Sequence, residues 1–264
     1  MPHSILVKFV PTESRSFDVS LGQQIHALFL NTIRKVDPDL SQKLHDESAG
    51  KPFTVSLPVN KKRRPISNFI AGEECFVRYT VFCDEIWEIF PQIISTFCNE
   101  TMHISHTEVN VVKVSFTPNG GGVNPGEDFR KLANSDPASK FELTFVSPTS
   151  FRLQGHSFIL PLPSLMYSGY LRKWNRYSGY EISEDILTDI DERLLISRVN
   201  LSSQVLHFSN YFQIGFTGQV MLNASDYSYR ERQMLTTLTK FAYFCGTGHK
   251  TTMGMGQTNV KLLT

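Results

Sequence analysis

Glycines, hydroxyls and one lysine are concentrated in the C-terminal segment CGTGHKTTMGMGQ, which covers residues 245–257. Its glycines are Gly246, Gly248, Gly254 and Gly256, and between the two pairs lie His249, Lys250, Thr251 and Thr252. Glycine lets backbone N–H groups approach a phosphate closely, while lysine and threonine side chains add charge and hydrogen-bond donors. The segment therefore indicates a phosphate-binding loop, and a flexible connection between a helix and a strand is the alternative interpretation.

This segment fits neither of the common nucleotide-binding fingerprints. A Walker A loop has a glycine directly before its lysine, whereas this chain has His249 before Lys250. A Rossmann fingerprint has a third glycine, whereas Gly248 is followed by His249, Lys250 and Thr251. The glycines therefore predict phosphate binding without predicting a standard nucleotide-binding unit.

Histidines occupy the other positions that could do chemistry. His45 closes a short predicted helix, and an imidazole suits proton transfer because its ordinary pKa lies near neutral pH. A histidine at a helix end can also simply interact favourably with the helix dipole, so both interpretations stay open. His103 and His106 have no third ligand nearby and do not make a zinc site. We expect no metal centre and no cofactor.

The net charge hides an uneven distribution along the chain. The whole sequence carries +1, which taken alone argues against a polyanionic partner. Residues 1–70 carry ten Lys/Arg and six Asp/Glu, residues 71–140 carry five and ten, and residues 194–264 carry six and two. Both ends are therefore basic around an acidic middle, which indicates either a polyanion-binding surface or ordinary solvated faces.

Composition excludes several classes of protein. The chain has 264 residues, of which 41% are hydrophobic, too many for a disordered chain and enough for two small domains. No run approaches the ~20 apolar residues that a membrane-spanning helix needs, and the N-terminus lacks a secretory signal. The four cysteines form no C-x-x-C pair and suit a reducing compartment. We expect a cytoplasmic protein that does not bind membranes.

The first half of the chain predicts the element order of a ferredoxin-like unit. Alternating apolar residues predict a strand over residues 4–10, and a capping box of Ser20 and Gln23 opens a helix over residues 20–36. Asp37-Pro38 then begins a short helix. Further elements are expected as strands over 53–57, 66–70, 75–82 and 109–116, and as a helix over 84–98 that Pro91 kinks or delays. Strand, helix, two strands, helix and strand follow the ferredoxin-like order.

The second half repeats this theme less clearly. Strands are expected over 141–146, 205–208, 211–222 and 257–262, and a helix over 183–191. A capping box of Ser228 and Glu231 opens another helix, which Gly246 ends. Residues 161–180 predict no single element. We therefore expect an α+β protein of two tandem ferredoxin-like, RRM-like domains, residues 1–125 and 126–264, with the boundary in the turn-rich segment 117–127.

These patterns together resemble a known family. The motif G-x-G-x-K-T-x-x-G-x-G, between a last helix and a last strand, resembles the glycine-rich loop of the RAMP superfamily of CRISPR-associated proteins. More narrowly, the chain resembles the sixth Cas family, the endoribonucleases that process CRISPR repeat RNA. The order of elements up to residue 54 and the strand motif FVSPTSF at residues 145–151 are similar to that family as well.

The resemblance implies an enzyme that cuts CRISPR precursor RNA within its repeats, without a metal, to produce crRNA. The ribose 2′-OH attacks the adjacent phosphorus and leaves a 2′,3′-cyclic phosphate and a 5′-hydroxyl, which requires a base, an acid and a cation. His45 matches the family's catalytic histidine and Lys51 its lysine, so the resemblance assigns proton transfer to His45 and charge stabilisation to Lys51. Some members carry a tyrosine where this chain has Leu30, and His26, one turn earlier, is the candidate for that role.

The implied partner is CRISPR repeat RNA, either as a hairpin or unfolded. The glycine-rich segment is expected to contact its phosphates, as are the basic residues Lys61, Lys62, Arg63 and Arg64, unless these form only a solvated turn. Other Cas subunits are further candidate partners, with the chain acting as a monomer or homodimer. A non-cleaving RNA-binding subunit of a CRISPR effector complex is the alternative function, and a phosphate-binding metabolic enzyme fits only the glycine-rich segment.

Overall fold

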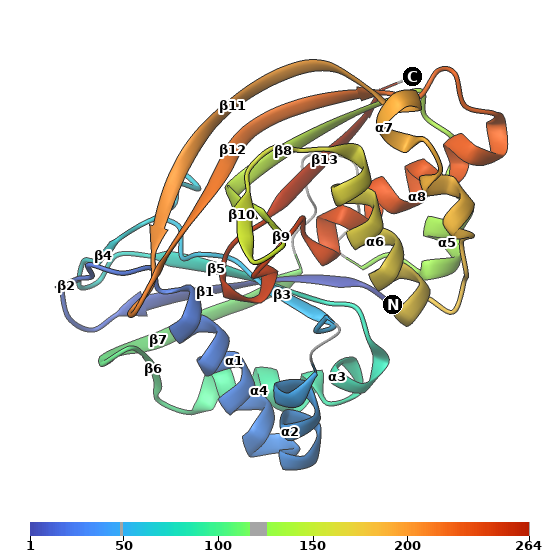
Figure 1. Ribbon diagram of the computed structural model, residues 1–264. Helices are drawn as coiled ribbons and strands as arrows, with labels where there is room; N and C mark the ends of the chain where they lie inside the picture. The colour runs from blue at the N-terminus through green and yellow to red at the C-terminus, as the bar shows by residue number, and fades with distance from the viewer. Residues whose placement is uncertain (48–49, 117–125, 264) are drawn as a thin grey trace.

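Two units, each made of an antiparallel sheet and helices, form the molecule (Figure 1). The computed structural model describes residues 1–47, 50–116 and 126–263. Within each unit the helices cover one face of the sheet, and the two units lie side by side. The prediction of an α+β protein with two ferredoxin-like domains is confirmed.

The strands are β1 (His3–Pro11), β2 (Arg15–Ser16), β3 (Phe53–Val55), β4 (Asn68–Phe69), β5 (Cys75–Val81), β6 (Met102–Ile104), β7 (Thr107–Phe116), β8 (Lys140–Thr149), β9 (Phe151–Leu153), β10 (His156–Phe158), β11 (Leu195–His207), β12 (Phe212–Asn223) and β13 (Thr258–Leu263). The helices are α1 (Gly22–Val36), α2 (Pro38–Asp46), α3 (Asp84–Glu88), α4 (Phe90–Asn99), α5 (Phe129–Ala133), α6 (Pro163–Tyr177), α7 (Ile190–Arg193) and α8 (Tyr229–Cys245), with short 3₁₀ turns η1 (Glu184–Leu187) and η2 (Thr251–Met253).

The first sheet has the order β3-β5-β1-β7-β6, which is the ferredoxin-like order with one extra edge strand. Its strands alternate between buried and partly exposed residues because successive side chains point to opposite faces. In β1, Ile5, Val7 and Phe9 are buried in the same core as Ile25 and Phe29 of α1. The sheet therefore presents α1 and α2 along one side of the molecule.

The second sheet has the order β11-β12-β8-β13 and repeats the ferredoxin-like arrangement. Helices α6 and α8 supply Trp174 and Phe241 to its core, where they pack with Phe141 and Leu143 of β8. Strands β11 and β12 have 13 and 12 residues, against 10 in β8 and 6 in β13, and they arch toward the first unit (Figure 1). At their tip the His207 carbonyl accepts a hydrogen bond of 2.6 Å from the Ser20 backbone N–H.

Several helix boundaries differ from those predicted. Helix α1 begins at Gly22, and Ser20 accepts a bond from the Gly22 N–H without making a capping box, so that prediction is wrong. The predicted helix over 84–98 is broken at Ile89, and Pro91 lies in the first turn of α4, where a missing N–H costs little. The capping box of Ser228 and Glu231 is confirmed at the start of α8.

The second half departs further from the prediction. Residues 161–180 contain α6, whereas the predicted helix over 183–191 consists of the short elements η1 and α7. Strand β11 begins at Leu195 instead of residue 205. The sequence did not predict its first part, because almost all of its residues are exposed and its apolar pattern is weak. The predicted domain boundary lies mostly in residues 117–125, outside the described residues, and stays a prediction.

Side chains from β5 join the two units. The Thr80 hydroxyl donates to the Phe244 carbonyl at 2.5 Å, and the Arg78 guanidinium donates to the Gln257 side chain at 2.6 Å. The same guanidinium lies over the Tyr243 ring at 4.4 Å. These contacts hold the end of α8 and the segment after it against the first sheet.

In the described part of the chain, no helix has the length and hydrophobicity needed to cross a bilayer.

Candidate active site and RNA-binding groove

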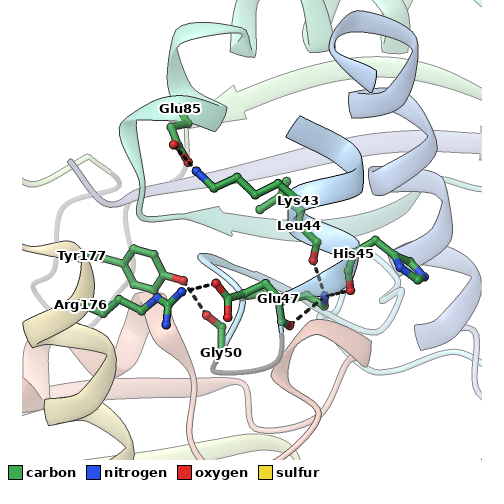
Figure 2. Close-up of polar contacts among 9 residues, drawn as sticks. Lys43, Leu44, His45, Glu47, Gly50, Glu85, Arg176 and Tyr177 are labelled. Atoms are coloured by element: carbon green, nitrogen blue, oxygen red, sulfur yellow. Dashed lines mark hydrogen bonds and ion pairs between the residues drawn. The ribbon is translucent and has the colours of Figure 1, made fainter. Parts of the chain in front are cut away.

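A groove of about 440 Å³ lies between three segments that are far apart in the sequence. Its lining consists of Glu47, Gly50 and Lys51 between α2 and β3, Arg172 and Lys173 of α6, and residues 248–253 of the glycine-rich loop. Four of the lining side chains are lysine or arginine, and Glu47 is the one carboxylate among the described lining residues. Glu47 is itself paired with Arg176 (Figure 2). The groove therefore suits an anionic ligand.

Helix α2 positions the first wall of the groove. Asp37 caps its start by accepting a bond from the Leu40 N–H at 2.9 Å, and Pro38 occupies the first turn. At its end the Lys51 ammonium donates to the carbonyls of Leu44, of His45 at 2.9 Å and of Glu47 at 3.3 Å. A cation at this position satisfies carbonyls that the helix leaves unpaired. Lys51 therefore closes the helix that carries His45.

Lys51 is partly removed from water by this arrangement. Burial lowers the pKa of its ammonium, while the nearby carboxylates of Glu47 and Asp46 raise it. The predicted catalytic residues His45 and Lys51 are thus neighbours, joined through the His45 carbonyl.

The His45 side chain is exposed, with 73% of its surface accessible. Its Nδ1 lies 3.1 Å from an Asp46 carboxylate oxygen. Because a carboxylate only accepts, Nδ1 carries the proton, and Nε2 is left free to exchange one in the neutral ring. The pKa of Asp46 is lowered by its bond from Gln42 and then by that from His45. In Figure 2 the imidazole projects away from Glu47, Gly50 and Tyr177.

His26 lies beneath the glycine-rich loop, on α1. Its Nδ1 donates to the Thr252 carbonyl at 3.0 Å, and its ring stacks on Phe53 at 5.6 Å. Burial, followed by the positive charge of Lys51, lowers the pKa of His26 to about 4. The ring is therefore neutral near pH 7, with the proton on Nδ1 and none on Nε2. His26 and His45 both lie beside the groove, outside its described lining.

The glycines of the loop are required by close packing. All four have positive φ angles: 65° at Gly246, 78° at Gly248, 90° at Gly254 and 68° at Gly256. A Cβ at Gly248 would lie 2.3 Å from the Ser150 carbonyl oxygen, and one at Gly256 would lie 2.0 Å from that of Thr247. Gly254 and Gly256 are buried, whereas residues 248–250 are partly exposed. Only part of the loop therefore faces the groove.

Lys250 of this loop contacts the tip of the β11–β12 hairpin. Its ammonium donates to the Tyr211 hydroxyl at 2.9 Å and lies 4.7 Å from the Tyr211 ring and 5.7 Å from the Phe208 ring. These cation–π contacts place a positive charge between the groove and the hairpin tip.

The basic residues Lys61–Arg64 form an exposed turn, as predicted, away from the groove lining. The Asn60 side chain accepts bonds from the backbone N–H groups of Lys62 and Arg64 and so shapes the turn. Lys61 pairs with Glu74 at 3.4 Å, and the Arg63 guanidinium lies 5.2 Å from the Phe76 ring. None of the described residues of this turn lines the groove.

Arg172 and Lys173 were missed by sequence reasoning because they lie in the unassigned segment 161–180. A signal was present: Met166, Tyr167, Tyr170, Leu171 and Trp174 recur at helical spacing and are all buried.

No group of three potential metal ligands occurs among the residues that the structure describes, His103 and His106 included.

Two family models match the chain. Residues 1–120 match the CRISPR Cas6 N-terminal domain, and residues 143–258 match the CRISPR-associated endoribonuclease Cas6. This chain belongs to the Cas6 family. The resemblance to the sixth Cas family is therefore confirmed.

Individual Cas6 proteins are similar to parts of the chain or to its fold. The CRISPR-associated endoribonuclease Cas6 of Mycobacterium tuberculosis is 25% identical over 142 residues, covering 53% of this chain and 45% of that protein. The CRISPR-associated endoribonuclease Cas6 of Streptococcus thermophilus is 27% identical over 118 residues, which cover 44% of this chain and 48% of that protein. The chain thus spans about half the length of the curated relatives it matches. A solved Cas6 product complex (TTHB231) has a TM-score of 0.83 at 23% identity, over 98% of this chain and 100% of the other, and so shares the fold.

Proposed function

We propose that this protein is an endoribonuclease that binds CRISPR precursor RNA and cuts it within each repeat to produce crRNA. The observation that carries the proposal is the cation-lined groove, bordered on one side by the helix end that carries His45 and on the other by the glycine-rich loop. The Cas6 family models, with relatives described as endoribonucleases, support the same activity.

The proposed reaction is an internal transesterification that needs no metal. A bond forms between the ribose 2′-oxygen and phosphorus, and the bond from phosphorus to the 5′-oxygen breaks. A base takes the 2′-hydroxyl proton, and an acid gives a proton to the leaving 5′-oxygen. The products are a 2′,3′-cyclic phosphate and a 5′-hydroxyl, with no water consumed.

His45 is the proposed proton-transfer residue. The Asp46 carboxylate holds its Nδ1 proton, which leaves Nε2 available to the substrate. The exposed position of His45 at the end of α2 lets an RNA strand reach it, and Lys51 closes the same helix end. Lys51 adds positive charge to the groove, where negative charge develops on the phosphorus oxygens.

His26 is the proposed second proton-transfer residue. It occupies the flank of α1 where Leu30 is buried and cannot transfer a proton. Its lowered pKa, about 4, keeps the ring unprotonated, which suits a base more than an acid. His26 would therefore take the proton of the 2′-hydroxyl on its Nε2, and His45, in its imidazolium form, would give its Nε2 proton to the leaving oxygen while Nδ1 stays bonded to Asp46.

Incubation with the CRISPR repeat RNA of the source organism in EDTA tests the proposal. We expect one cut per repeat, with a cyclic phosphate on the upstream product. The same RNA with 2′-deoxyribose at the cleavage site should bind and stay intact, because it lacks the nucleophile. Uncut ribose RNA, or cutting of the deoxy RNA, would contradict the proposed reaction.

A non-cleaving RNA-binding subunit of a CRISPR effector complex is the second candidate function. The observation that favours it is Leu30, which leaves one proton-transfer role to a histidine whose Nδ1 is engaged by the glycine-rich loop. Such a subunit would bind ribose and deoxy repeat RNA equally well and cut neither. Association with other Cas subunits, and a monomeric or homodimeric state, remain predictions.

A further inference from the structure

Lys173 is a buried lysine whose ammonium borders the groove. The residue is 8% exposed and lies on α6, one residue after the exposed Arg172. Its Nζ donates to the Cys245 carbonyl at 2.6 Å and is 3.4 Å from the Thr251 hydroxyl. Both partners are uncharged.

Such a cation is costly to bury. Lysine is almost never fully buried unless it is paired, because its ammonium loses its hydration. An anionic ligand in the groove would supply the missing negative charge. An ammonium also has three N–H protons, and the two described partners account for two of them. Lys173 therefore has both a charge and a donor to offer to a ligand.

Lys51, on the opposite wall, differs in this respect. Its three protons are used by the carbonyls of Leu44, His45 and Glu47. Lys51 thus contributes charge while it holds the end of α2, and a direct bond to a ligand would require it to release a carbonyl. Lys173 can make such a bond without giving up either of its partners.

The groove is narrow where these two walls approach each other. A Cβ built on Gly50 would lie 3.9 Å from Cε of Lys173. Nearby, the Tyr177 hydroxyl donates to the Gly50 carbonyl at 2.6 Å, which fixes α6 against the segment that follows α2 (Figure 2). Lys51 and Lys173 therefore line the same groove from walls that lie close together.

We propose that Lys173 is a catalytic residue that donates a hydrogen bond to a non-bridging oxygen of the scissile phosphate and stabilises the charge of the transition state. This assignment rests on the proposed endoribonuclease function and identifies the cation that acts directly on phosphorus. Lys173 keeps its proton throughout, while the protons that move are those of the 2′-hydroxyl and of the acid.

The surroundings of Lys173 make its protonation sensitive to alkaline pH. Burial lowers the pKa of the ammonium, the Arg172 guanidinium lowers it further, and the Cys245 thiol raises it. The other charged or titratable groups around the groove are Glu47, Lys51, His249 and Lys250. Since Lys173 is charged below its pKa, the proposed role predicts that cleavage slows as pH rises through that pKa.

The first test compares Lys173→Met with Lys240→Met under single-turnover conditions, using the repeat RNA in EDTA. Lys240 is a matched control, because it is also a largely shielded lysine of the second unit, paired with Glu127 away from the groove. We expect K173M to slow cleavage by roughly 10²–10³-fold, as the loss of an oxyanion donor does, while binding of the 2′-deoxy RNA changes less than about threefold. K240M should cut at the wild-type rate. Wild-type cleavage by a folded K173M would overturn the assignment and leave the proposed function intact.

The second test uses Lys173→Arg, which keeps the charge and is informative even if K173M does not fold. A guanidinium stays protonated at all accessible pH values. We expect K173R to cut within about tenfold of wild type, because charge stabilisation persists, and to extend cleavage to higher pH than wild type. If the cleavage rate of K173R declined with rising pH in the same way as that of wild type, the assignment would be overturned. If the wild-type protein itself leaves the repeat RNA uncut, the proposed function fails and this inference fails with it.

Discussion

The segment from His45 to Lys51 and the glycine-rich loop border the same groove, yet they are held in place in different ways. The first presents an exposed imidazole and is closed by one lysine side chain bound to three carbonyls. The second is held by backbone contacts so close that Gly248 and Gly256 have no room for a Cβ. Substitution of His45 should therefore change the chemistry, and substitution of the buried loop glycines should change the fold.

The largest expected effect comes from His45→Ala. We expect cleavage to slow by roughly 10²–10⁴-fold, because a proton-transfer group is lost, with RNA affinity and thermal stability close to wild type. Single-turnover kinetics and a melting curve check this. His103→Ala, at an exposed histidine of β6, is the control and should cut normally. A large loss of stability in H45A would remove the contrast between the two segments.

Gly256→Ala should act on the fold. Its Cβ would collide with the Thr247 carbonyl oxygen at 2.0 Å, on a backbone with φ of 68°. We expect a loss of about 3 kcal/mol in the free energy of unfolding, combining overpacking with left-handed strain. The matched control is Gly155→Ala, with φ of 85° and nothing within 4 Å of the added Cβ. It should lose about 1 kcal/mol, from strain alone. Equal losses in urea denaturation would mean that packing of the loop is not what requires glycine.

Acid should weaken the packing of the glycine-rich loop against α1 through His26. Its pKa is about 4 in the folded protein and near 6.5 when unfolded, so the unfolded chain binds more protons between these values. Stability should therefore fall as pH decreases from about 6.5 to 4, by at most ~3 kcal/mol for this residue.

Buried His3, whose pKa is also lowered to about 4, acts in the same direction. We expect the free energy of unfolding to fall less steeply with decreasing pH in His26→Asn than in wild type. The double variant with His3→Asn should show a still smaller dependence on acid pH. An acid limb in H26N identical to that of wild type would show that His26 does not couple the loop to pH.

The smallest expected effects concern individual surface cations. Lys250→Ala should weaken RNA binding less than about tenfold and reduce the slope of log K against log salt by about 1, if Lys250 contacts one phosphate. Lys62→Ala provides the comparison, since its turn lies away from the groove lining. An equal change of slope in K62A would extend the RNA-binding surface to that turn, whereas no change would leave the turn as a solvated face.

The ferredoxin-like units were predictable from local patterns. Alternation of Ile5, Val7 and Phe9 predicted β1, and the capping box of Ser228 and Glu231 predicted α8. Helix α6 was missed because proline precedes it and its buried side includes tyrosines and Lys173, which weaken its apolar pattern. Ser20 failed as a cap because the chain turns into the helix one residue later, at Leu21.

The sequence by itself determined the two ferredoxin-like units, the glycine-rich loop and the proximity of His45 to Lys51, because each depends on short-range periodicity, capping or spacing. Only the tertiary structure decided how the cations are used. It directs the protons of Lys51 to the end of α2, separates the turn Lys61–Arg64 from the groove lining and brings Lys173 to the opposite wall. Those outcomes depend on packing between segments far apart in the chain, which local residue patterns do not encode.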